Sequence, residues 1–122
     1  MNITSVRSFA MGLAEVTEEP HHHFSSFRVA GKIFVTVPPD QEHIHVFIPE
    51  DAREQAFATY PEFTEKLLWG GKVVGVRVTL PSANAVAVKS MVKAAWQVKA
   101  SAAPTSKARK SPLATRRRPS EA

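Results

Sequence analysis

Residues 26–37 have the sequence SFRVAGKIFVTV, and this stretch decides the fold of the first half of the chain. The side chains on both sides of Ala30-Gly31 follow a period of two, which is typical of strands. Gly31 can adopt the positive φ that a tight turn requires. The stretch therefore predicts a β-hairpin whose strands cover residues 27–29 and 32–37.

The predicted hairpin also assigns side chains to the two sheet faces. A two-residue loop would place Val29 opposite Lys32 and Phe27 opposite Phe34, all on one face. Phenylalanine rings beside a lysine can stack bases and hold phosphates. Two aromatic residues at strand spacing are more often core packing, and we expect both to be buried. The β-branched run predicts that the helix-covered face holds Ile33, Val35 and Val37.

Apolar side chains at helical spacing predict three helices, near residues 6–14, 49–60 and 83–100. Candidate N-caps for the first are Asn2, Thr4 and Ser5. Ser82 is expected to cap the last one, whose apolar stripe ends at Trp96.

Two further strands are expected, at residues 43–48 and 74–80, the second after a turn at Gly70-Gly71. The order is then helix, hairpin, strand, helix, strand, helix. This order predicts an α+β fold with two layers, in which an antiparallel sheet carries helices on one face.

The composition limits the class of protein. A chain of 122 residues is long enough for one domain. The absence of cysteine excludes disulfides, thiolate metal sites and a cysteine nucleophile. The first residues lack a signal-peptide pattern, and no stretch approaches about 18 apolar residues. We therefore expect a cytoplasmic protein without membrane contact.

Common enzyme motifs are missing from the sequence. It contains no G-x-S-x-G, P-loop or G-x-G-x-x-G pattern. His21-His22-His23 and His43-x-His45 could offer imidazoles to a metal ion, but the nearby acidic residues suit turns and solvent equally well. We expect neither catalytic residues nor a cofactor, and no metal site.

The net charge of +5 comes entirely from the C-terminal segment. Residues 1–100 contain ten Lys and Arg and ten Asp and Glu, whereas residues 101–122 contain six cations and only Glu121 as an anion. We expect a domain over 1–100 and a disordered tail over 101–122, because the tail has little apolar surface to bury. The tail is either a phosphate-seeking arm or a solubilising extension. Its cations are Lys107, Arg109, Lys110, Arg116, Arg117 and Arg118.

Four cations within the domain are the best candidates for phosphate contacts because they lie in or beside predicted strands and turns. For any single one of them, a solvated surface charge is the simpler interpretation. They are Arg28, Lys32, Lys72 and Arg77.

The chain resembles the MmcQ/YjbR family of small bacterial proteins over about residues 5–99. The resemblance rests on the F-R-V-x-G-K-I-F hairpin at 27–34, with E-E-P before it and W-G, V-R-V and A-W after it. It implies a CyaY-like (frataxin-like) α+β fold with a double-wing DNA-binding motif. It further implies that Arg28 and Lys32 lie on a wing, with Arg77 on a later strand.

Three hypotheses about function follow. The first is a non-enzymatic protein that binds DNA, or RNA, without sequence preference, in the cytoplasm or nucleoid, with most affinity from the basic tail. The second is a protein-interaction module that uses the sheet face around Phe27 and Phe34. The third is metal or small-molecule binding through His21, His23, His43 and His45.

Overall fold

The structure, a computed structural model, describes residues 1–102. Within them the chain forms α1 (Ile3–Met11), β1 (Val16–His21), β2 (Phe24–Val29), β3 (Lys32–Val37), β4 (His43–Val46), α2 (Glu50–Thr59), β5 (Thr64–Trp69), β6 (Lys72–Thr79), a short 3-10 helix (Leu80–Ser82) and α3 (Ala85–Ala102). From residue 103 on, the basic tail lies outside the described residues.

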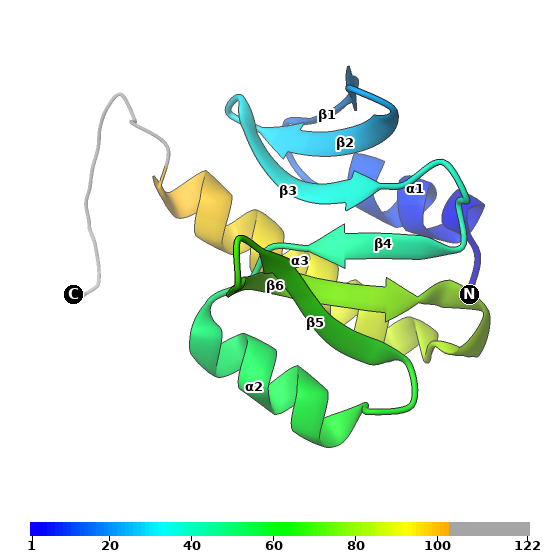
Figure 1. Cartoon of the computed structure of the whole chain (residues 1–122). Helices are drawn as coiled ribbons and strands as arrows, with labels where there is room; N and C mark the ends of the chain where they lie inside the picture. Colours follow the sequence, from blue (N-terminus) through cyan, green and yellow to red (C-terminus); the bar gives the residue numbers. More distant parts are fainter. Residues whose placement is uncertain (103–122) are drawn as a thin grey trace.

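The six strands form one antiparallel sheet in the order β1-β2-β3-β4-β6-β5. All three helices pack on one of its faces (Figure 1): α3 contacts β2, β3 and β4, α1 contacts β1, and α2 contacts β5 and β6. The expected two-layer α+β fold is confirmed. Among residues 1–102, no helix covers the other face, which carries Ser26, Thr36, His45 and Arg77 and is called the open face below.

The helix-covered face and the helices enclose an apolar core. Phe27, Phe34, Ile44 and Val88 are fully buried within it. The interpretation of Phe27 and Phe34 as core residues is therefore confirmed. Neither ring is available to a ligand or a protein partner, which removes the form of the interaction hypothesis that used them.

The predicted pairing of Phe27 with Phe34 is wrong. Val29 does pair with Lys32, but a β-bulge between Phe27 and Arg28 shifts the register, and Phe27 pairs with Val35. Phe27 and Val35 therefore share the helix-covered face. The residue left without a partner is Phe34, and because both of its neighbours, Ile33 and Val35, are apolar, the alternating pattern could not reveal the insertion.

Two strands were missed, and the start of α3 and the end of α1 differ from those expected. Strands β1 and β5 were not predicted, since VTEEPH and TEKLLW are edge strands rich in charged residues or Pro. Ser82 lies in the 3-10 helix, and Asn84 accepts the Ala87 N–H, which makes Asn84 the cap of α3. At α1, Asn2 is the cap, accepting the Ser5 N–H at 2.9 Å, and the helix ends at Met11.

Two hairpin turns lie at the same end of the sheet, here called the turn end. Ala30-Gly31 joins β2 to β3 and Gly70-Gly71 joins β5 to β6, and all four residues have positive φ, as in type I′ turns. Because β4 runs antiparallel to both β3 and β6, it ends where both of them begin. The 18 residues of α3 span about 27 Å, and Figure 1 shows that this helix also finishes at the turn end.

None of the helices within residues 1–102 is long and apolar enough to cross a membrane.

Candidate nucleic-acid interface

A row of polar residues crosses the open face from one edge of the sheet to the other. Each member is the cross-strand partner of the next, so their side chains share one face. In sheet order the row is Glu19, Ser26, Thr36, His45, Arg77 and Glu65.

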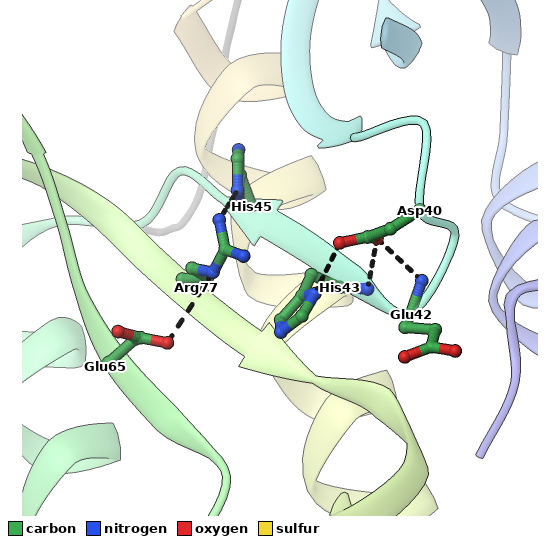
Figure 2. Close-up of polar contacts among 6 residues, drawn as sticks. All are labelled: Asp40, Glu42, His43, His45, Glu65 and Arg77. Atoms are coloured by element: carbon green, nitrogen blue, oxygen red, sulfur yellow. Dashed lines mark hydrogen bonds and ion pairs between the residues drawn. The ribbon is translucent and has the colours of Figure 1, made fainter.

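Polar contacts link four of the five neighbouring pairs in this row. Ser26 Oγ donates to the Glu19 carbonyl at 2.7 Å. Thr36 Oγ1 lies 3.3 Å from His45 Nδ1, and Arg77 Nη1 lies 3.3 Å from His45 Nε2. Arg77 Nε lies 3.6 Å from Glu65 Oε2, and Figure 2 shows Arg77 between the histidine and the carboxylate.

His45 is buried although it lies on the face that α1, α2 and α3 leave uncovered. Its side chain lies under Arg77 and against the Phe24 ring, whose centroid is 5.8 Å away. A guanidinium can only donate, so Nε2 accepts from Arg77 and the proton of the neutral ring is assigned to Nδ1, which donates to Thr36. Burial, followed by the positive charges of Arg77 and His43, lowers the pKa of His45 to about 4. His45 is therefore neutral at pH 7 and orients Arg77.

The other histidines do not join this arrangement. His43 Nδ1 lies 2.9 Å from Asp40 Oδ2. The pKa of Asp40 is lowered, mainly because its carboxylate accepts the backbone N–H of Glu42. In the described part of the chain, no three His, Asp or Glu side chains gather closely enough to hold a metal ion.

The four candidate cations of the domain occupy two regions. Lys32 and Lys72 are exposed at the turn end, each the first residue after a hairpin turn. Arg28 and Arg77 are half-buried on the open face. Arg28 donates to Ser26 Oγ and the Pro20 carbonyl. The six tail cations, Lys107, Arg109, Lys110, Arg116, Arg117 and Arg118, lie outside the described residues.

The polar row and an aromatic pair at the turn end were missed by the sequence analysis. Phe47 and Trp69 have ring centroids 5.9 Å apart. The alternating Thr36 and His45 inside apolar strands were a usable signal for the row, since polar residues there mark one face. The aromatic pair had no local signal, because 22 positions separate its members.

These features define a class: a two-layer α+β domain with a polar open face and two hairpins whose turns share one end. The chain belongs to the YjbR family, whose model matches residues 11–98. This confirms the family resemblance. Its fold is similar to that of Deinococcus radiodurans protein DR2400, described with family domain DUF419, at a TM-score of 0.69 and 15% identity. That likeness covers 80% of this chain and 77% of DR2400. No match was found among curated proteins.

Proposed function

We propose that this chain is a non-enzymatic nucleic-acid-binding protein of the double-wing type, with the β2–β3 and β5–β6 hairpins as wings. The observation that carries the proposal is the convergence at the turn end: both hairpin turns, exposed Lys32 and Lys72, and the last residues of α3, after which the basic segment follows. In the sequence, the segment with the six arm cations follows α3, whose last residues lie at the turn end.

The distribution of charge assigns different roles to the domain and the arm. Residues 1–100 have no net charge, so their long-range attraction for a polyanion is weak. Six cations in the arm can neutralise up to six phosphates, which corresponds to a salt slope of about −5 on a log–log plot. The arm therefore supplies most of the affinity, and contacts to phosphates give no preference for a particular sequence.

Arg77 can exchange its present partner for a phosphate. Its ion pair with Glu65 is long, at 3.6 Å, and the Glu65 side chain is 61% exposed. Exposed pairs of this kind contribute only about 0–1 kcal/mol. The contact with neutral His45 holds the guanidinium in position without neutralising its charge. Arg77 is thus an oriented cation on the open face, available to a backbone phosphate.

Fluorescence anisotropy with labelled 16-mer DNA, single-stranded and duplex, over a salt series tests the proposal. With the two wing lysines added to the arm, the full chain should bind with a slope of about −5 to −7. Replacing all six arm cations with Gln should reduce the slope to about −1 to −2, and Lys32→Gln with Lys72→Gln should weaken binding while changing the slope by about 2. Lys89→Gln with Lys93→Gln, on α3, is the matched control.

Two results would contradict the proposal. Absence of binding by the full chain at low salt would favour a protein partner instead. Equal losses in the Lys32/Lys72 and Lys89/Lys93 variants would show that the wings act only through total charge.

A further inference from the structure

The turn end exposes apolar surface that the fold does not use. Trp69 is 59% exposed and its neighbour Leu68 is 56% exposed, whereas most large apolar side chains of the domain are buried. The Phe47 and Trp69 rings are tilted by 56° to each other. A tilted ring does not lie flat on its partner, so Phe47 supports the indole without covering its face.

Gly75 makes room for this aromatic pair. A Cβ atom at Gly75 would lie 3.3 Å from Phe47 Cδ1 and 2.7 Å from the Val46 carbonyl oxygen. The missing side chain therefore lets Phe47 lie against β6, where it reaches Trp69. The position of the indole is thus fixed by packing on the sheet, although its face is exposed.

A cation lies directly beside the pair. Trp69 is the cross-strand partner of exposed Lys72. Phe47, two residues after His45, lies on the open face with Arg77, whereas Lys32 is the cross-strand partner of Val29 on the helix-covered face. An exposed aromatic face beside cations is the combination that binds single-stranded nucleic acid, in which bases stack and phosphates meet positive charge.

We propose that Trp69, supported by Phe47, stacks on an unpaired base of single-stranded DNA or RNA held at the turn end. This inference rests on the proposed function and adds a substrate class to it. In a duplex each base is already stacked on its neighbours and paired, so the indole can reach only an end or an opened site. A single strand offers a free base face at every position.

The test compares binding of a labelled 16-mer of dT and a 16-bp duplex by the full chain and its variants. Trp69→Ala should weaken binding to the single strand by about 5- to 150-fold, from about 1–3 kcal/mol per stacked base. Binding to the duplex should change less than about twofold. Trp69→Phe should retain most of the affinity, because the aromatic face remains. Leu68→Ala is the matched control for loss of exposed apolar surface and should leave both affinities unchanged.

Intrinsic fluorescence gives a second reading that does not depend on affinity. The chain has two tryptophans, and Trp96 is half-buried with its Nε1 donating to the Ala14 carbonyl. In the Trp96→Phe variant, saturation with oligo-dT should quench the emission of Trp69. In the Trp69→Phe variant, the emission of Trp96 should stay constant.

Different results would overturn the proposed function and the stacking role of Trp69. If the wild-type chain binds neither probe, the proposed function fails and the inference with it. If it binds both probes and Trp69→Ala weakens them equally or not at all, only the inference is overturned. Concentration-dependent dimerisation in sedimentation velocity, abolished by Trp69→Ala, would also overturn it, because the indole would then lie between two copies of the chain.

Discussion

The two faces of the sheet have opposite chemistry although they are built from the same strands. On the covered face, Phe27, Val35 and Val78 are completely buried. On the open face, the residues one step along the same strands, Ser26, Thr36 and Arg77, form a polar row. Alternation along each strand therefore separates a face that packs against the helices from a face that carries the polar row. Ser26, Thr36 and His45 are buried in that row, and Arg77 and Glu65 are its accessible members.

The largest expected effect lies on the covered face. Phe27→Ala should lower the free energy of unfolding by about 3–5 kcal/mol, because it removes a fully buried ring and leaves a cavity. Leu68→Ala removes an apolar side chain that is 56% exposed and should change stability by less than about 0.5 kcal/mol. Urea unfolding measures both, and similar values for the two variants would contradict the difference between the faces.

The open face should make stability depend on pH. The pKa of His45 is about 4 in the fold, below its ordinary value of 6.5, so the unfolded chain binds the proton more readily. Stability should therefore be greatest above pH 6.5 and fall by up to about 3 kcal/mol as the pH drops to 4. Urea unfolding at pH 7.5, 6, 5 and 4.5 measures this.

The control for this pH dependence is His45→Gln, which has no titrating ring. Its stability should be nearly constant between pH 6.5 and 5. The lowered carboxyl pKa values of Glu18 and Asp40 remove further stability only below about pH 4.5, so they do not contribute in that window. An unchanged pH profile in the variant would show that His45 is not the cause.

Gly75→Ala tests whether the close packing of Phe47 against β6 holds Trp69 in position. The added methyl would meet the Val46 carbonyl at 2.7 Å, which forces the strands or Phe47 to move. We expect a loss of about 1–3 kcal/mol. If Phe47 moves, Trp69 loses its support, and single-strand binding should fall further than duplex binding. Unaltered stability would show that the close approach at Gly75 is easily relieved.

The smallest expected effect on stability is at the open-face ion pair. Glu65→Gln should change the free energy of unfolding by less than about 0.5 kcal/mol, because the pair is long and exposed. Binding to nucleic acid should become tighter, since Arg77 loses a competing carboxylate. Glu62→Gln, at an exposed position outside the polar row, is the matched control in the same anisotropy assay. Weaker binding by Glu65→Gln would contradict the role given to Arg77.

The sequence predicted the elements whose apolar patterns are strong and missed features that depend on tertiary contacts. The hairpin at 27–37 and the helix covering most of 49–60 were recognisable because their periodicities are local. Strand β5 was not predicted, because TEKLLW contains two charged residues and its only strand partner, β6, is a tertiary contact. Because of the bulge beside Phe27, this residue lies on the sheet face opposite to the predicted one.

The residues of the candidate site also fall into those that the sequence predicted and those that depend on tertiary contacts. Lys32 and Lys72 were identified because each follows a glycine turn that is visible in the sequence. The contact of Phe47 with Trp69 depends on the sheet order β4-β6-β5 and on the absence of a side chain at Gly75. Neither property can be read from one segment alone.

A ¹H–¹⁵N correlation spectrum of the full chain, recorded during titration with oligo-dT, tests the central claim most directly. Binding on the open face and the turn end predicts shifts for the amides of Lys32, Lys72 and Arg77 and for the indole N–H of Trp69. The indole N–H of Trp96, which is bonded to the Ala14 carbonyl on the helix side, should not move. Shifts confined to α2 and α3 would contradict the assignment of function to the open face.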